Sequence, residues 1–188
     1  MPTPRRTSLE AIVAAGCDLL EIGGLEGLTM QSVAVRVGVR APSLYKWVRN
    51  RGDLIALIAD ASVRDLGARL DAAAGSDGDA RERLHRLAAA ARTFAHERPA
   101  AFRLVFAPGA DLRLDDGALA AASASVLRVA GELAGQEHAL DAARTFTAWA
   151  NGFVSMELAG AFRLGGEVDR AFDFGVDRLA EAMSRQPA

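Results

Sequence analysis

The chain has 188 residues, of which 51% are hydrophobic and 24% charged, and its net charge is −2. These values are ordinary for a soluble globular protein, and the length allows a sizeable core in one or two modest domains. The sequence has no run of 18 consecutive apolar residues, and residues 1–6 lack an apolar signal region. We therefore expect neither a membrane partner nor secretion, and the predicted location is the cytoplasm.

The first predicted helix begins at Thr7, which forms a possible capping box with Glu10 three residues later. Its apolar residues recur at helical spacing. The glycine pair Gly23 and Gly24 is expected to end this helix.

Two short helices are predicted next. Thr29 can cap a helix that runs through Val37, because its hydroxyl can accept from a backbone N–H of the first turn. Gly38 suits the left-handed position that ends a helix, and Pro42 suits the first turn of the following one. Two short helices about a tight glycine-containing turn form a helix-turn-helix, whose second helix enters the major groove of DNA.

The same segment is strongly basic. Every ionisable residue between Gly27 and Gly52 is a cation, which gives a local charge of +5, whereas residues 53–188 carry a net charge of −5. A compact basic patch on an acidic body is the field expected of a protein that meets phosphate through one small region. The alternative is a solvated basic helix face. The cations are Arg36, Arg40, Lys46, Arg49 and Arg51.

The run Val39 to Leu54, VRAPSLYKWVRNRGDL, resembles the recognition-helix signature of the TetR family of bacterial transcriptional regulators. The match is dense over about 25 residues, with Thr29 and Gly38 where the family has them. Two later runs, Phe94 to Pro108 and Thr145 to Phe162, resemble the regulatory-domain subtype named for a Trp-His-Gly motif. This chain has Asn151 where that motif has histidine.

Arg40, just before the second helix, is the best candidate for a bidentate contact to guanine, and Ser43 can bond either base type. Ala41 and Pro42 offer only apolar surface, for instance to a thymine methyl. If Arg40 contacts only phosphate, base reading shifts to Ser43 and DNA shape. The resemblance implies that Tyr45, Lys46, Trp47 and Arg51 hold the DNA backbone and that Thr29 contacts phosphate. For Tyr45 and Trp47, core packing is the alternative. The candidate DNA-binding residues are Thr29, Arg40, Ala41, Pro42, Ser43, Tyr45, Lys46, Trp47 and Arg51.

Only helical patterns follow in the rest of the chain. A long helix opens at Asp53 and fades into the sequence GSDGD, and an irregular loop is expected over residues 107–117. The other predicted helices cover residues 81–96, 100–106, 117–134, 140–164 and 168–183. The sequence predicts an all-α fold of about nine helices, with a DNA-binding domain in residues 1–52 and an effector-binding and dimerisation domain in residues 53–188.

A single DNA-binding domain of this size buries little DNA surface, so useful affinity is expected from a dimer that reads two half-sites about 34 to 36 Å apart, or a multiple of that. Segments 140–164 and 168–183 are the candidate dimerisation helices, because pairing them across a two-fold axis makes a four-helix bundle. The family also uses its last two helices in this way.

We call the predicted DNA-binding domain, residues 1–52, the head and the predicted effector-binding and dimerisation domain, residues 53–188, the body. Regulation of the head by the body requires a ligand that binds two conformational states of the protein with different affinities. An apolar cavity between helices is the usual site. An aromatic and methionine stripe at helical spacing is also typical of plain core, which is the alternative here. The candidate pocket residues are Phe102, Phe106, Trp149, Phe153 and Met156.

Nothing in the sequence favours an enzyme. The three histidines have no metal-ligand spacing, and there is neither a glycine-rich phosphate loop nor a Gly-x-Ser-x-Gly motif. We expect no metal and no cofactor. The prediction is a ligand-responsive, sequence-specific DNA-binding regulator, a repressor by family tendency, which binds a palindromic operator as a homodimer and is released by a small apolar effector. The alternative is an effector-independent DNA-binding or architectural protein.

Overall fold

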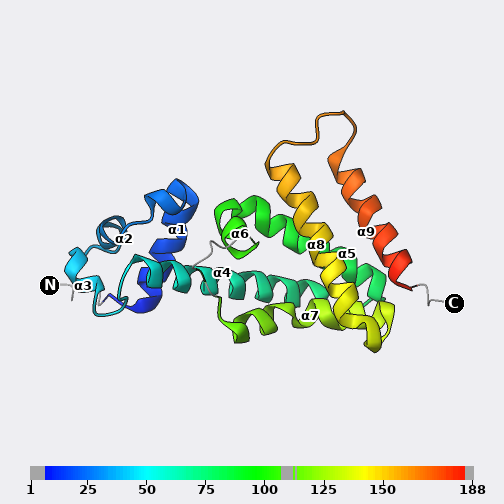
Figure 1. Cartoon of the computed structure of the whole chain (residues 1–188), viewed down its shortest axis with the longest axis horizontal. Coiled ribbons are helices and arrows are strands. Elements are labelled where there is room, and N and C mark those ends of the chain that lie inside the picture. Colours follow the sequence, from blue (N-terminus) through cyan, green and yellow to red (C-terminus); the bar gives the residue numbers. More distant parts are fainter. Residues whose placement is uncertain (1–6, 107–111, 113, 185–188) are drawn as a thin grey trace. The chain divides into compact units, whose positions relative to one another are not determined.

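A computed structural model describes residues 7–106, 112 and 114–184. Within these residues the chain forms nine α-helices and one short 3₁₀ helix, with no strand (Figure 1). The all-α prediction is confirmed. The predicted loop over residues 107–117 lies largely outside the described residues, and α7 already begins at Asp116.

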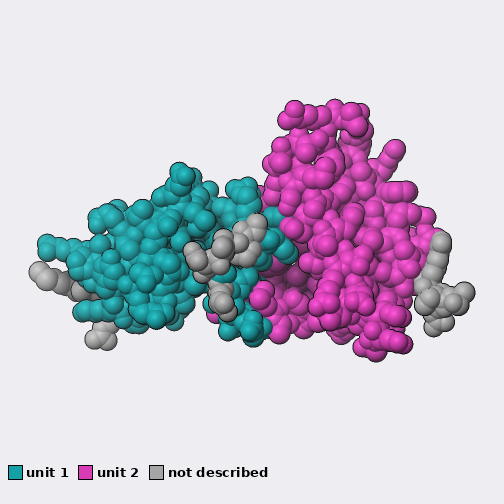
Figure 2. Space-filling view, in the orientation of Figure 1, with its two compact units in different colours: residues 1–63, 98–118 teal, residues 64–97, 119–188 magenta. Residues whose placement is uncertain are grey.

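The chain divides into two compact units (Figure 2). Unit 1 contains residues 1–63 and 98–118, and unit 2 contains residues 64–97 and 119–188. The division falls inside α4, and it assigns α6 to the same unit as the N-terminal helices. The functional division after residue 52 stays a prediction.

Unit 1 is built around an apolar core shared by its first four helices. They are α1 (Leu9–Gly27), α2 (Met30–Val37), α3 (Ala41–Leu44) and the first part of α4 (Arg51–Ala74), and α6 (Pro99–Phe106) completes the unit. Among residues 9–58, the largest buried side chains are Ile12, Leu20, Leu28, Val33, Leu44, Val48, Leu54 and Ile58. A Cβ at Gly16 would clash with Ile58, so this glycine allows α1 and α4 to approach closely.

The first helix differs from the prediction at both ends. Ser8, rather than Thr7, is the N-cap, and its hydroxyl accepts from the N–H of Ala11 at 3.2 Å. The predicted stop at Gly23 and Gly24 is instead a kink: Gly24 has φ 60° and ψ −165°, after which the helix resumes to Gly27. Glycine tolerates this conformation without strain, so the chain bends there and continues.

Unit 2 contains the remainder of α4 together with α5 (Ala80–Glu97), most of α7 (Asp116–Ala134), α8 (Ala139–Leu158) and α9 (Val168–Ser184). The predicted helix 140–164 is too long, because α8 ends at Leu158. Gly160 follows with φ 63°, a left-handed conformation that terminates helices. The main buried side chains of the unit are Leu66, Leu70, Leu84, Leu87, Phe94, Val129, Phe146, Val154, Phe172 and Val176.

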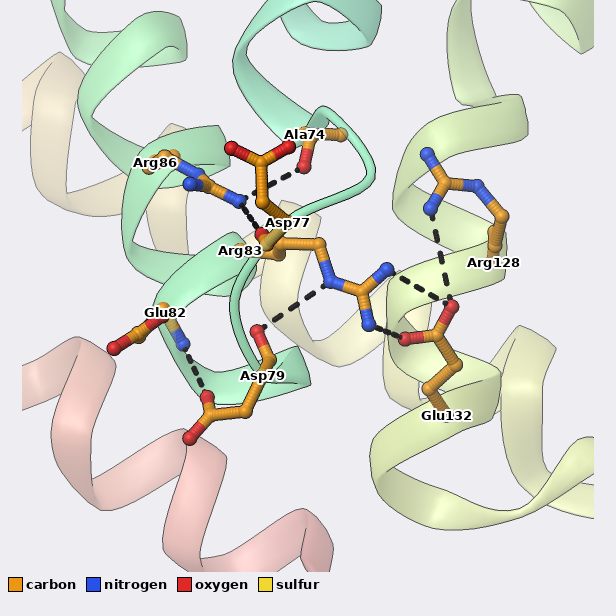
Figure 3. A network of polar contacts seen from close by, with 8 residues as sticks. All are labelled: Ala74, Asp77, Asp79, Glu82, Arg83, Arg86, Arg128 and Glu132. Atoms are coloured by element: carbon orange, nitrogen blue, oxygen red, sulfur yellow. Dashed lines mark hydrogen bonds and ion pairs between the residues drawn. The ribbon is translucent and has the colours of Figure 1, made fainter.

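A polar network holds the turn between α4 and α5 (Figure 3). The guanidinium of Arg86 donates to the carbonyl of Ala74 at 3.1 Å and to that of Asp77. Arg83 forms a bidentate ion pair with Glu132 of α7, and the Arg83 side chain is only 13% exposed. The carbonyl of Ala74, the last residue of α4, is thus satisfied by a side chain of the following helix.

Among the described helices, α7 is the one that is long and apolar enough, by composition, to cross a membrane. Its most apolar 18-residue window has a mean hydropathy of 1.2, and 33% of that window is buried. This helix contains no uninterrupted apolar run of 18 residues, because serine, glycine and charged residues interrupt its alanine-rich sequence. One helix of this kind is weak evidence for a membrane span, and the expected absence of a membrane partner stays a prediction.

Candidate DNA interface and effector-binding region

The start and end of α2 follow the predicted local chemistry. The hydroxyl of Thr29 accepts from the N–H of Ser32 at 3.0 Å, and the Ser32 hydroxyl accepts from the N–H of Thr29 at 2.9 Å, which completes a capping box. At the other end Gly38 has φ 77° and ψ 32°. The predicted Thr29 cap and the left-handed glycine are confirmed, and together they fix the tight turn into α3.

Helix α3 is short, and two buried side chains anchor it and the turn after it. It spans Ala41–Leu44 and continues as turns in which the N–H of Val48 donates to the carbonyl of Leu44 at 3.0 Å. Leu44 and Val48 are buried. Arg40 occupies the N-cap position of α3, and its guanidinium makes no ion pair or hydrogen bond with the described residues, so it is available to a partner outside the head.

The two aromatic residues after α3 lie at the surface. Tyr45 is 56% exposed and Trp47 is 47% exposed. About half of each residue is therefore accessible, which speaks against core packing as their main role. Their hydroxyl and indole N–H groups can serve as donors to a partner.

Acidic residues neutralise part of the basic patch. Arg36 pairs with Asp18 of α1 at 2.8 Å, and Arg49 pairs with Asp53 at 3.0 Å. Hydrogen bonding to Arg49 lowers the pKa of the Asp53 carboxyl. The local charge counted along the sequence therefore overstates the field at this surface, because both acids lie outside the segment that was counted.

Of the remaining three cations, one is hydrogen-bonded to backbone carbonyls and two make no such contact. The Nε of Arg51 donates to the carbonyl of Leu28 at 2.7 Å, and its guanidinium also donates to that of Leu25, so Arg51 ties the start of α4 to the end of α1. Any phosphate contact of Arg51 shares the guanidinium with these carbonyls. In the described part of the chain, Arg40 and Lys46 are the cations of the patch that have no ion pair or side-chain hydrogen bond.

The five candidate pocket residues are distributed over both units. Phe102 and Phe106 pack ring against ring in unit 1, with centroids 4.8 Å apart. The other three belong to α8 in unit 2, where Met156 is 50% exposed. A pocket that contains all five residues stays a prediction.

Within unit 2 the aromatic residues of α8 pack on Phe172 of α9. The ring of Trp149 lies 5.4 Å from that of Phe172 and stacks on it, and Phe153 meets Phe172 edge-on at 5.2 Å. A Cβ at Gly175 would clash with the Trp149 indole, so glycine is needed at that position in α9. Helical spacing does not connect Phe172 to Trp149, because the two residues lie on different helices.

Arg92 of α5 is the centre of an ion-pair cluster that sequence reasoning missed. Its Nε lies 2.8 Å from Glu157, its terminal nitrogen lies 2.6 Å from Asp169, and its guanidinium covers the Phe172 ring at 4.8 Å. The Nε2 of His96 lies 3.2 Å from Glu157 as well. Hydrogen bonding to Arg92 lowers the pKa of the Glu157 carboxyl. Glu157 and Asp169 lie 65 and 77 residues after Arg92, so no sequence spacing reveals these pairs.

A second cluster joins α5 to α9. Asp177 accepts from Arg81 at 2.7 Å and lies 3.0 Å from the Nε2 of His85, and these contacts lower its pKa, with Arg81 as the main cause. A cleft of about 620 Å³ lies beside both clusters, with acids and bases along its walls. Its lining residues are His85, Ala89, Arg92, Thr93, His96, Glu97, Glu157, Asp169, Phe172 and Asp173. No group of three potential metal ligands with suitable geometry occurs among the described residues.

Helices α8 and α9 and the segment that connects them carry the exposed large apolar residues of unit 2 in the described part of the chain. Phe174 is 64% exposed, and Leu164 in the connection is fully exposed. Gly152 has open space around it, so it adds no bulk to the surface of α8. The other exposed large apolar residues of the unit are Leu140, Met156 and Phe162. All five lie in or between the segments predicted to form the dimer.

Comparison with known proteins identifies relatives of both halves of the chain. Residues 84–179, just over half of the chain, match the family model of the tetracyclin repressor-like C-terminal domain. An uncharacterized HTH-type transcriptional regulator of Mycobacterium tuberculosis is 28% identical over 187 residues, which cover 97% of this chain and 84% of the relative.

Two solved structures share the fold. A TetR variant from Acinetobacter baumannii AYE, in complex with minocycline, has a TM-score of 0.70 and 23% identity, covering 94% of this chain and 96% of that one. The structure of BioQ with its natural double-stranded DNA operator has a TM-score of 0.68 and 23% identity, covering 95% of this chain and 99% of that one. At these identities the likeness establishes the fold, and the bound molecules are properties of those two proteins.

Proposed function

Because the chain belongs to the TetR family of helix-turn-helix transcriptional regulators, which are not enzymes, we propose that it is a ligand-responsive repressor that binds an inverted-repeat operator as a homodimer. A small apolar effector in each body changes the spacing of the two heads and releases the DNA. The site of action is the cytoplasm. Repression rather than activation follows the tendency of the family.

The observation that carries this proposal is that two cations at and after α3 have no partner among the described residues. Arg40 and Lys46 are cations without partners in the described structure, while the buried Leu44 and Val48 fix the backbone between and after them. Arg40 stands before the first turn, from which an inserted helix reaches base edges, and it is assigned to guanine. Ser43 reads either base type, and Ala41 and Pro42 contact a thymine methyl.

Phosphate contacts are assigned to the residues around this reading surface. The exposed Tyr45 and Trp47 donate from the end of α3, Lys46 contributes its full charge, and Thr29 and Arg51 contact phosphate from the starts of α2 and α4. Positions of this kind orient a protein on DNA without reading sequence. Arg36 and Arg49, each paired with an acid, serve only the general field.

Dimerisation is assigned to α8 and α9, within segments 140–164 and 168–183. Exposed apolar residues such as Met156 and Phe174 are costly to leave in water, and exposed patches of this type mark interaction surfaces. A two-fold axis through this surface makes it self-complementary, so the same patch covers its copy.

The effector site is assigned to the body, with Phe102, Phe106, Trp149, Phe153 and Met156 as candidate lining residues. The minocycline complex of a structural neighbour shows that this fold accommodates a small molecule in that protein. Resemblance to the Trp-His-Gly subtype stays a prediction, and Asn151 replaces the imidazole on which a role at that position would depend.

Selection of bound fragments from a random DNA pool by the purified full-length protein, at about physiological salt, tests the proposal. We expect enrichment of an inverted repeat whose half-sites are separated by about one helical turn or a multiple of it. Binding without enrichment, lost steadily as salt rises, would contradict sequence-specific regulation and support the architectural alternative.

A further inference from the structure

Glu21, near the C-terminal end of α1, binds the first turn of α6. Its two carboxylate oxygens accept from the backbone N–H groups of Ala100 at 3.0 Å and Ala101 at 2.8 Å. These partners lie 79 and 80 positions further along the chain, and all three residues belong to unit 1. A side chain of the head therefore holds the backbone of α6.

The donors that Glu21 satisfies have no substitute inside α6. The first N–H groups of a helix lack intrahelical acceptors, and Pro99 at the start of α6 has no N–H at all. Ala100 and Ala101 are both buried, so water does not readily replace a lost acceptor. A negative carboxylate also interacts favourably with the positive end of the helix dipole. The Glu21 carboxylate thus ties the first turn of α6 to α1.

The residues that follow Glu21 lead directly to the DNA-binding elements. Gly24 interrupts the helical geometry three residues later. Beyond this kink, Arg51 at the start of α4 donates to the carbonyl of Leu28, the residue before the Thr29 cap of α2. Residues 21–28, which we call the α1 exit segment, are held by α6 before the kink and by α4 after it.

Helix α6 is in turn continuous with the rest of the body. Only Arg98 separates the end of α5 at Glu97 from the start of α6 at Pro99, so a shift at the end of α5 is passed to α6 through the covalent chain. We infer that Glu21 is a positioning residue that couples α6 to the DNA-binding head through the α1 exit segment. The inference rests on the proposed function, because it names how the body regulates the head.

Thermodynamic linkage makes this coupling testable before any effector is known. If the state of α6 affects DNA binding, then DNA binding must affect α6 to the same extent. Hydrogen exchange of the full-length protein, free and bound to its selected operator, is therefore measured for the wild type, Glu21→Ala and Glu21→Gln. Glu26→Ala is the matched control, because Glu26 is an exposed carboxylate in the last turn of the same helix.

In the wild type, operator binding is expected to slow exchange at the Ala100 and Ala101 amides by about tenfold. Glu21→Ala still binds the operator but loses this response, since no acceptor links the two helices. Glu21→Gln retains part of it, because the amide oxygen still accepts a hydrogen bond. The control variant Glu26→Ala responds as the wild type does. If Glu21→Ala does not fold, Glu21→Gln supplies the comparison.

If DNA binding still slows exchange at Ala100 and Ala101 in Glu21→Ala, the inference is overturned. A lower stability of that variant would not rescue it, because a purely structural role of Glu21 also lowers stability. Specific operator binding by the wild type with no change in α6 would also overturn it, while the proposed function stands. Failure to select any operator would overturn both.

Discussion

Arg40 before α3 and Arg92 in α5 carry the same charge in opposite surroundings. Arg40 has no capping bond and no ion pair in the described structure, and the head around it is held together by buried aliphatic side chains. Arg92 is only 19% exposed and is bound by Glu157 and Asp169. Apolar packing thus fixes the backbone around Arg40 and leaves its charge for a partner, whereas α5, α8 and α9 add ion pairs to their apolar packing.

This difference decides what an arginine means in a chain where arginine outnumbers lysine by 21 to 1. Position, and not residue type, separates a DNA contact from a structural ion pair. Substitutions at the two kinds of position should therefore fail in different assays: loss of folding stability in unit 2 and loss of DNA binding in the head.

The largest effect on stability is expected from Arg92→Met. The substitution keeps an apolar stem but leaves Glu157, whose side chain is 13% exposed, without its main partner. Removal of one member of a largely buried pair should lower the free energy of unfolding by about 3 kcal/mol. Urea denaturation of the full-length protein measures this.

Arg128→Met is the matched control for Arg92→Met. Arg128 also pairs with a glutamate, but at 3.8 Å and with a side chain that is 43% exposed, so its loss should cost less than about 1 kcal/mol. Equal destabilisation by the two substitutions would show that the Arg92 cluster is no more than a surface ion pair.

Arg40→Ala should cost about 1 to 3 kcal/mol of binding free energy on the selected operator and relax the base preference at one position of each half-site. Its folding stability should not change. Arg40→Lys keeps the charge but loses the bidentate geometry that recognises guanine, so it should be nearly as defective on the operator. Equal losses on operator and random DNA would show instead that Arg40 reads only phosphate.

Sequence reasoning succeeded in the head because the determining interactions there are local. The Thr29 cap bonds a residue three positions away, and Gly38 acts through its own backbone, so both are visible in a short window. The first helix was the exception at both ends, because Ser8 rather than Thr7 caps it and Gly24 bends it instead of ending it. A glycine in this pattern permits either an end or a bend, and the choice depends on the contacts that follow it.

In unit 2 the same reasoning identified helices but not their contacts. The ion pairs of Arg92 and the stacking of Trp149 on Phe172 join segments far apart in the chain, and neither follows from helical spacing. The end of α8 was misplaced because residues 159–164 are apolar apart from Arg163, while the left-handed Gly160 stops the helix. Contacts between segments far apart in the chain cannot be identified from local spacing in one sequence.

Lys46→Ala and Arg51→Ala distinguish a cation that only contacts DNA from one that also stabilises the head. Each is expected to lower the slope of log affinity against log salt by about one, which is the loss of one phosphate contact. Arg51→Ala should also lower thermal stability, because it removes donors from the carbonyls of Leu25 and Leu28, whereas Lys46→Ala should not. Salt titrations on random DNA and thermal melts measure both. An unchanged slope in Arg51→Ala would remove that residue from the DNA contacts and leave it a purely structural role.

The smallest expected effect is a dependence of the stability of unit 2 on pH. Hydrogen bonding to Arg92 lowers the pKa of Glu157 below its ordinary value of 4.5, so the folded state favours the ionised carboxylate more than the unfolded state does. The stability from this group is therefore fully present above the ordinary glutamate pKa and is lost as pH falls through the folded-state value. Glu157→Gln should be less stable than the wild type at pH 7, and the gap should narrow as the pH is lowered below about 5. Urea denaturation across this pH range measures the difference in stability between Glu157→Gln and the wild type, with Glu26→Gln as an exposed control. A difference that stays constant with pH would mean that Glu157 contributes through packing rather than through its charge.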